Sequence, residues 1–257
     1  MHIITVSNQK GGVAKTTTAY CLASGLQRRG YRVLGIDLDP QANFSVICRA
    51  EIEQAPTIYE LLAGEEGAGV EQVIQHLTFD VIPANILLSG ADQRFIQPAR
   101  EFMLKEILEP IQDRYDYIIL DTPPSLGYLT INAYTSSTDI IIPTLAESLP
   151  LRGIQQLYST VLAIQKRLNP SLKIRGILFT QYDTRTAISR AMHDLGNQAS
   201  QIIHAPVFES YIRSTVRVKE SQAMQQDLYE YSPDATAAQD YEHFIDELLA
   251  AFQADEA

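Results

Sequence analysis

The feature that most constrains this chain is a glycine-rich loop close to its amino terminus. Apolar residues 3–6 lead into the segment N-Q-K-G-G-V-A-K-T-T at positions 8–17, and apolar residues then recur with helical spacing until Gly30. In a strand–loop–helix unit of this kind, the backbone N–H groups of the loop point toward an anion. The anion lies at the amino end of the helix, which carries a partial positive charge. The lysine and threonine that close such a loop contact the outer phosphates and Mg²⁺. The sequence therefore predicts a nucleotide-binding α/β fold.

The loop departs from the strict phosphate-loop pattern at two positions. That pattern places glycine six residues and one residue before the lysine, and these positions hold Gln9 and Ala14. A second lysine, Lys10, lies five residues before Lys15. The resulting K-G-G-x-x-K-T-T segment resembles the deviant Walker A box of the ParA/MinD family. A chance glycine turn is disfavoured because a strand precedes the segment and a helix follows it.

The resemblance implies roles for individual residues. It implies that Lys10 and Lys15 act in catalysis and that Thr16 is a ligand of Mg²⁺. The residues that it assigns to ATP binding are Lys10, Gly11, Gly12, Val13, Ala14, Lys15, Thr16 and Thr17, together with Ile212 and Arg213. The family's base-packing Ile-Pro-Arg run falls on residues 212–214, which read I-R-S, so its proline is absent here.

Two acids follow short apolar runs farther along the chain. Asp39 lies in D-L-D-P-Q-A-N after residues 32–36, and Asp121 follows residues 117–120. The carboxyl ends of parallel strands meet at one edge of a sheet, so both acids are expected near the loop. They resemble the family's Walker A′ and Walker B segments. The resemblance places Asp39 beside the attacking water as a catalytic residue, and Asp39 and Asp121 with Thr16 at the metal. An acid before proline is also an ordinary turn former, which the order of the segments disfavours.

Length and composition predict one domain over residues 1–257. The chain is 46% hydrophobic and contains neither a Pro/Ser-rich linker nor a repeat. Apolar runs at 140–142 and 174–179 alternate with helical patterns around 154–168 and 188–198. This alternation predicts the P-loop NTPase fold, an α/β architecture in which helices cover both faces of a mostly parallel, twisted sheet.

The sequence predicts neither a membrane segment nor a cysteine site. No apolar stretch approaches the roughly 18 residues of a membrane span, so a cytoplasmic protein is expected. Cys21 and Cys48 fit neither a disulfide framework nor a metal centre, unlike the iron-binding and cluster-scaffold relatives of the superfamily.

MinD-type proteins end in a basic amphipathic helix that lies on membrane. Residues 244–252 here carry acids on the polar face, which anionic lipid would repel.

Charge is distributed unevenly along the chain. The net charge is −11, yet residues 152–219 contain ten Lys and Arg against three Asp and Glu. A basic block in an acidic chain predicts contact with phosphate backbones, and a solvated helix surface remains the alternative. Within the block, Y-D-T-R-T at 182–186 and S-T-V-R-V-K-E at 214–220 resemble the D-x-R-T and N-V-R-x-x-E segments of ParA proteins. The residues that this resemblance assigns to nonspecific double-stranded DNA are Arg185, Arg213, Arg217 and Lys219.

The resemblance covers nearly the whole chain and implies a function. The family's Gly-Lys-Pro turn falls on residues 225–227, which read Q-Q-D, so one basic residue of the DNA surface is absent. The implied protein is a nucleoid-associated ATPase that forms an ATP-dependent sandwich homodimer through Lys10. It binds nonspecific DNA, and a ParB-like protein or cargo adaptor stimulates its hydrolysis of ATP during plasmid or chromosome segregation.

Two alternatives stay open. The same motor could position a protein cargo, such as a carboxysome or a chemoreceptor cluster. A metabolic P-loop enzyme of the dethiobiotin-synthetase kind is the competitor from another class, and it would need neither Lys10 nor a basic surface.

Overall fold

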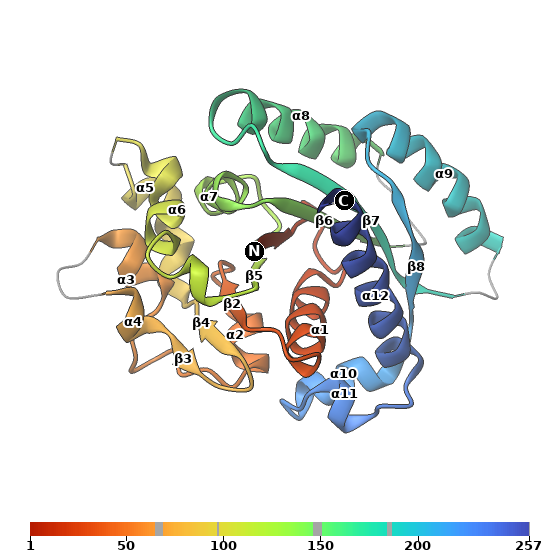
Figure 1. The fold of residues 1–257 in the computed structure, drawn as a ribbon, viewed down its shortest axis with the longest axis horizontal. Coiled ribbons are helices and arrows are strands. Elements are labelled where there is room, and N and C mark those ends of the chain that lie inside the picture. Colours follow the sequence, from red (N-terminus) through yellow and green to blue (C-terminus); the bar gives the residue numbers. More distant parts are fainter. Residues whose placement is uncertain (65–68, 97, 146–150, 184–186, 257) are drawn as a thin grey trace.

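One sheet of eight strands runs through the molecule (Figure 1). The computed structural model describes residues 1–64, 69–96, 98–145, 151–183 and 187–256. The strand order is β3-β4-β2-β5-β1-β6-β7-β8, in which β3 is antiparallel to β4 and every other pair is parallel. The strands are β1 (His2–Val6), β2 (Val33–Asp37), β3 (Gln75–His76), β4 (Asp80–Ile82), β5 (Tyr117–Asp121), β6 (Asp139–Leu145), β7 (Lys173–Tyr182) and β8 (Val207–Arg213). The predicted fold class is confirmed.

Helices cover both faces of this sheet. Figure 1 shows α1 and α12 side by side on one face, with α7, α8 and α9 on the other. The α-helices are α1 (Lys15–Arg28), α2 (Asn43–Ile47), α3 (Ile58–Ala63), α4 (Val70–Val73), α5 (Ala91–Arg94), α6 (Met103–Leu108), α7 (Tyr128–Ser136), α8 (Leu151–Arg167), α9 (Ala187–Ile203), α10 (Val216–Ala223), α11 (Leu228–Tyr231) and α12 (Thr236–Glu256). Short 3₁₀ helices are η1 (Ile86–Gly90), η2 (Arg100–Phe102) and η3 (Gln112–Arg114).

Strand β5 shows how the sequence builds two apolar layers. Successive side chains of a strand point to opposite faces of the sheet. Ile119 therefore joins the core under α1 and α12, whereas Ile118 and Leu120 join the core beside α3, α6 and α7. All three side chains are completely buried, so β5 lies in the centre of the sheet and holds its carboxyl end rigidly.

The carboxy-terminal helix α12 belongs to the core. Phe244, Ile245 and Leu248 are completely buried in the layer that also contains α1. The apolar face of α12 is therefore covered by the rest of the molecule rather than available to lipid. Within the described residues, no helix is both long and apolar enough to cross a bilayer.

The register of the central strands determines which residues meet at the carboxyl edge. Val6 of β1 lies opposite Asp121 of β5, and Asp121 lies opposite Asp37 of β2. The glycine-rich loop begins directly after Val6, so two acids from separate strands are brought beside it. This edge is the place where parallel α/β sheets bind their ligands.

Candidate active site

The loop between β1 and α1 has an open, left-handed backbone. Gly12 has φ +74° and Ala14 has φ +63°. A Cβ atom added to Gly11 or Gly12 would meet no atom within 4 Å. The left-handed conformation explains why the strict motif has glycine at the second position, and a nonglycine there costs about 1 kcal/mol. The loop thus has open space beside Gly11 and Gly12, and its contact with a phosphate chain stays a prediction.

Side chains from the loop itself hold its first half. Asn8 Nδ2 donates to the Pro143 carbonyl at 2.8 Å, and Asn8 Oδ1 accepts from the Lys10 backbone N–H at 3.0 Å. The buried Lys15 ammonium lies 3.4 Å from the Lys10 carbonyl. Burial lowers the pKa of Lys15, and the neighbouring carboxylates of Asp121 and Asp39 oppose that shift. Lys15 is therefore held at the centre of the loop, where a phosphate would replace the carbonyl as its partner.

Strand β7 holds the second half of the loop. Thr180 Oγ1 donates to the Val13 carbonyl at 3.1 Å, and Gln181 Nε2 donates to the Gly12 carbonyl at 2.9 Å. Gln181 itself has φ +52°. Two carbonyls of the loop are thus bonded to the scaffold, which leaves the loop N–H groups as the groups that could bind an anion.

Asp37 and Asp39 have different environments after β2. Asp37 is completely buried and accepts hydrogen bonds from the Asp39 N–H at 3.0 Å, the Ser45 N–H at 2.9 Å and the Ser45 hydroxyl at 2.7 Å. Burial outweighs these bonds and raises the pKa of Asp37 to about 6. Asp39 is half-buried and accepts from the Gln41 N–H at 2.9 Å. Asp37 thus positions the backbone of Asp39, and Asp39 is the acid that solvent can reach.

Asp121 is completely buried, and its carboxylate has few donors. No described residue donates to it with full hydrogen-bond geometry, although the Thr16 hydroxyl lies close enough for a weak hydrogen bond that lowers its pKa. Burial and the nearby Asp37 raise the pKa of Asp121 well above its usual value, against opposing effects of Thr16 and Lys15. A buried carboxylate with few donors, beside a hydroxyl, fits Mg²⁺, which prefers oxygen ligands.

The described residues contain no group of three or more His, Cys, Asp or Glu side chains that could hold a metal on their own. Magnesium in nucleotide sites uses one or two carboxylates and takes its other ligands from phosphates and water. The residues therefore fit a metal that arrives with a nucleotide better than a permanently bound one.

A cavity of about 270 Å³ adjoins the loop. Its lining includes Gly12, Ala14 and Thr17 from the loop and the start of α1. From β8, α10 and the segment between them it includes Ile212, Arg213, Ser214, Thr215, Val218, Lys219 and Gln222. The fold therefore brings Ile212 and Arg213 to the loop, where the resemblance placed them.

The two residues differ in how far their side chains are available. The Ile212 side chain is buried in the core. The Arg213 guanidinium forms a bidentate pair with Asp240, with Nε–Oδ2 and Nη2–Oδ1 distances of 2.9 Å and 2.6 Å. A direct contact of either side chain with a base stays a prediction.

The residues predicted to bind DNA lie around α10 where they are described. Arg185 lies outside the described residues. Arg217 is exposed and pairs with Glu220 at 2.9 Å, and the exposed Lys219 also lines the cavity beside the loop. Since Arg213 is bonded to Asp240, Arg217 and Lys219 are the more available cations of this group, and their contact with DNA stays a prediction.

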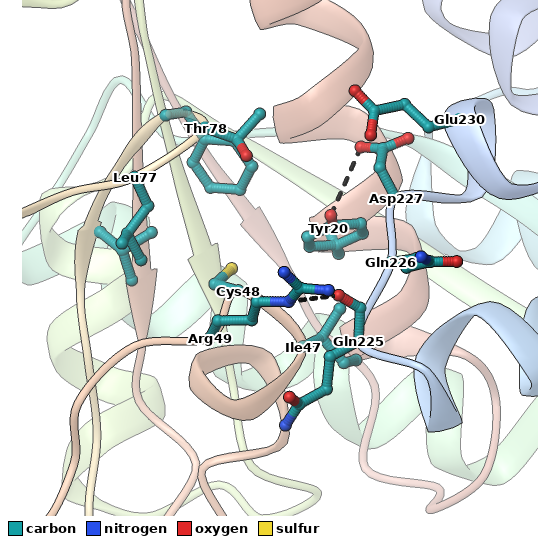
Figure 2. A pocket seen from close by; sticks show the side chains of 12 residues that line it. Tyr20, Ile47, Cys48, Arg49, Leu77, Thr78, Gln225, Gln226, Asp227 and Glu230 are labelled. Atoms are coloured by element: carbon teal, nitrogen blue, oxygen red, sulfur yellow. Dashed lines mark hydrogen bonds between the residues drawn. The ribbon is translucent and has the colours of Figure 1, made fainter.

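The Q-Q-D turn at 225–227 borders a second cavity, of about 210 Å³ (Figure 2). Gln225 has φ +50°, the left-handed conformation that the family's glycine would adopt. Asp227 turns inward, where its carboxylate accepts from the Tyr229 N–H at 2.7 Å, from the Tyr20 hydroxyl at 3.3 Å and from the Ser24 hydroxyl. The turn is thus anchored by an acid rather than extended by a basic residue.

Sequence reasoning missed several residues that shape the site. Asp37 had no predicted role, although its position at a strand end was visible. Gln181 and Gln222, which bond to Gly12 and Thr17, belong to no recognised motif and lie far from the loop in sequence. Only a measure of spatial proximity could have found them.

Comparisons with known proteins agree with this geometry. A family model described as an AAA domain matches residues 1–174. The sporulation initiation inhibitor protein Soj of Bacillus subtilis is 38% identical over 255 residues, which cover 96% of this chain and 98% of Soj. The chromosome partitioning protein ParA of Caulobacter vibrioides is 34% identical and covers 97% of this chain and 94% of its own.

A solved structure is also similar over nearly the whole length. Cobyrinic acid a,c-diamide synthase from Mycobacterium smegmatis, with bound ADP and magnesium, superposes with a TM-score of 0.86 at 32% identity. The match covers 99% of this chain and 96% of that protein. Family model, full-length identities and fold agree, and the chain belongs to the ParA/MinD-type family of P-loop ATPases.

Proposed function

We propose that this ParA-like ATPase binds ATP with Mg²⁺, dimerises across the nucleotide and binds nonspecific DNA in order to segregate a plasmid or chromosome. The observation that carries the nucleotide part is the Asp121 carboxylate, which is buried near Lys15 beside an open glycine loop and has no well-formed hydrogen bond from the described residues. Relatives named for chromosome partitioning support the cellular role.

The chain's own residues suggest how hydrolysis proceeds. The loop N–H groups and Lys15 bind the phosphates and stabilise negative charge as it develops. Thr16 and Asp121, with Asp39, would hold Mg²⁺, which neutralises the phosphate oxygens when bound. Asp39 orients the attacking water, because it is the acid at this edge that solvent reaches.

The decisive experiment compares two loop and strand-end variants. Asp39→Ala removes the group that orients water and leaves the loop intact, so it should bind ATP and hydrolyse it at least tenfold more slowly. Lys15→Ala should lose nucleotide binding instead. Hydrolysis by Asp39→Ala at the wild-type rate would remove Asp39 from the mechanism.

Dimerisation is assigned to Lys10, which the resemblance places across the interface. An ammonium group gains a strong anionic partner there only when the γ-phosphate is present. ATP, but not ADP, should therefore double the mass measured by light scattering. If Lys10→Ala dimerises with ATP as well as the wild type does, the sandwich assignment is wrong.

DNA binding is assigned to Arg185, Arg213, Arg217 and Lys219. Affinity should be similar for unrelated duplexes, should require ATP and should fall steeply with salt, because phosphate contacts release counterions. Arg185→Glu and Arg217→Glu should each weaken binding to every duplex alike in gel shifts. Undiminished binding by both variants would contradict the assignment, and ATP-dependent dimerisation serves as the control for folding.

The cargo and the stimulating partner define the remaining alternatives. A ParB-like protein and a cargo adaptor of a protein compartment would both act on the same motor, and fluorescence of the tagged protein over the nucleoid would fit either. The name of the solved synthase keeps a metabolic role as the second candidate. ATP turnover that DNA and Lys10→Ala leave unchanged would favour that metabolic role.

A further inference from the structure

Helix α10 contacts the phosphate-binding region through one side chain amide. Gln222 Nε2 donates a hydrogen bond to Thr17 Oγ1 at 2.8 Å. Both residues are half-buried and line the cavity beside the loop. Thr17 lies in the first turn of α1, where the helix N–H groups face an anion. The bond therefore joins α10 to the part of α1 that a nucleotide would contact.

The direction of this bond determines what the Thr17 hydroxyl can do next. A hydroxyl has one proton to donate and two lone pairs to accept with. An amide N–H₂ group cannot accept, so Gln222 occupies a lone pair of Thr17 and leaves the Thr17 proton for another partner. Gly12 and Ala14 line the same cavity. A phosphate oxygen lying there would be the natural acceptor for that proton.

Helix α10 also carries two of the cations assigned to DNA, Arg217 and Lys219. Its amino end is fixed by Thr215, whose hydroxyl accepts from the Arg217 N–H at 3.3 Å, and the preceding Ser214 N–H donates to the Tyr182 carbonyl at 3.1 Å. The first bond caps α10, and the second connects the residues just before α10 to β7. The bond from Gln222 connects the other end of α10 to α1, so the orientation of the helix depends on both contacts.

We propose that Gln222 is a positioning residue that aims the Thr17 hydroxyl proton at bound nucleotide and thereby links the placement of α10 to nucleotide occupancy. The proposal rests on the proposed ATP binding. It adds a route by which nucleotide at the loop orders Arg217 and Lys219, which α10 carries. The coupling is reciprocal, because DNA held by α10 would also favour the bonded arrangement of Thr17.

The test compares Gln222→Ala with Gln226→Ala, an exposed glutamine four residues later that serves as the matched control. ATP affinity in the presence of Mg²⁺ is measured by calorimetry, and amide hydrogen exchange is followed over residues 216–223. Gln222→Ala should weaken ATP binding about 3- to 10-fold, the effect of one hydrogen bond. ATP should slow exchange of α10 in the wild type and in Gln226→Ala, and slow it much less in Gln222→Ala.

A double-mutant cycle separates positioning from a general loss of packing. In a Thr17→Val background, which has no hydroxyl, Gln222→Ala should cause no further loss of ATP affinity. Gln222→Glu should bind ATP more weakly than Gln222→Ala, because a carboxylate would accept the Thr17 proton and repel phosphate.

Each result bears on the proposal. Wild-type ATP affinity and unchanged protection of α10 in Gln222→Ala would overturn it, and so would equal losses in the Thr17 and Thr17→Val backgrounds. ATP binding by the wild type without protection of α10 would overturn the link alone and leave the ATPase assignment standing. Failure of the wild type to bind ATP would overturn both.

Discussion

Two buried aspartates lie at opposite ends of the central strands and have opposite environments. Asp121 at the carboxyl edge is 0% exposed, and Asp139 at the amino end of β6 is 1% exposed. Asp139 accepts from Arg175 Nε at 2.8 Å and from Thr138 Oγ1 at 2.7 Å, and His2 lies 3.3 Å away. Asp121 accepts no well-formed hydrogen bond from the described residues.

The pKa values follow the partners rather than the burial. Burial alone would raise the pKa of Asp139, but its hydrogen bonds with His2, Thr138 and Arg175 lower it. Burial and the nearby Asp37 raise the pKa of Asp121, and the described residues supply it with weaker compensation than Asp139 receives. Buried carboxylates with few donors are costly to a fold and are enriched at functional sites.

The paired edge also joins the two ends of the chain. Arg175 bonds to Asp255 of α12 at 2.9 Å and lies over the Phe252 ring, and His2 of β1 stacks on the same ring at 3.7 Å. The amino edge is therefore a structural junction. Two equally buried aspartates therefore differ in the donors around them. Asp139 is a structural residue, and Asp121 is the one proposed to act in the nucleotide site.

The largest expected effect comes from Asp121→Asn. The substitution should lower ATP hydrolysis by about 10²–10³-fold, because the proposed magnesium ligand is weakened. The free energy of unfolding should stay level or rise by about 1 kcal/mol, because a poorly compensated buried carboxyl group is replaced by a neutral amide. Phosphate release and chemical denaturation measure the two effects. A clear loss of stability would break the comparison between the edges.

Asp139→Asn should show the reverse behaviour. The substitution leaves Arg175 without its buried partner and should lower the free energy of unfolding by about 3 kcal/mol. ATP hydrolysis per folded molecule should stay within about twofold of the wild type, because the residue lies at the opposite edge. Denaturation curves and turnover of the same samples provide both numbers, and a stable but inactive variant would contradict the structural role.

Mild acid should raise the free energy of unfolding of the nucleotide-free protein, because the buried aspartates at the carboxyl ends of the strands bind protons. The pKa of Asp37 is about 6 when folded, against about 3.9 for an unfolded aspartate. The folded state thus binds a proton more tightly, and its contribution to stability grows as pH falls from 7 through 6. Between pH 7 and 5 the expected gain is about 1 kcal/mol.

Control measurements sharpen this pH prediction. The pKa of Asp121 is raised by burial as well, so Asp121→Asn should show a smaller gain than the wild type. Because the pKa of Asp139 is lowered, acid has the opposite effect on its contribution to stability. That contribution is lost only when pH falls below about 4. Denaturation curves that show falling stability between pH 7 and 5 would contradict the prediction.

The smallest effect is expected from Lys173→Ala. Lys173 pairs with Asp255 at 3.0 Å, and the two side chains are 61% and 39% exposed. Exposed ion pairs contribute little, so the free energy of unfolding should change by less than about 0.5 kcal/mol. A loss of unfolding free energy as large as that of Asp139→Asn would contradict this. It would show that the exposed pair stabilises this end of the sheet as much as the buried pair of Arg175 and Asp139 does.

Much of the fold could be predicted because its sequence patterns are local or repeated along the chain. The runs at 117–120, 140–142 and 174–179 are central strands buried on both faces, so they appear as continuous apolar segments. Strand β8 was missed because it lies at the sheet edge, where the burial alternates and the register with β7 is irregular. Strand β3 has two residues, which is too short for any pattern.

The loop, the helix that follows it and the acids at two strand ends follow from local sequence. These features depend on neighbours in the chain, on backbone preferences of glycine and on the rule that parallel strands end at one edge. Roles for residues 10–17 could therefore be predicted before any contact was known.

Which residues have hydrogen-bond partners depends on the tertiary structure. Gln222 meets Thr17, and Arg175 meets Asp139, across long separations in sequence that no periodicity records. The same holds for the lack of a well-formed hydrogen bond to Asp121 from the described residues. Hydrogen bonds form between groups that the packing of the sheet and helices brings within about 3 Å, and this packing is a property of the whole chain rather than of a segment.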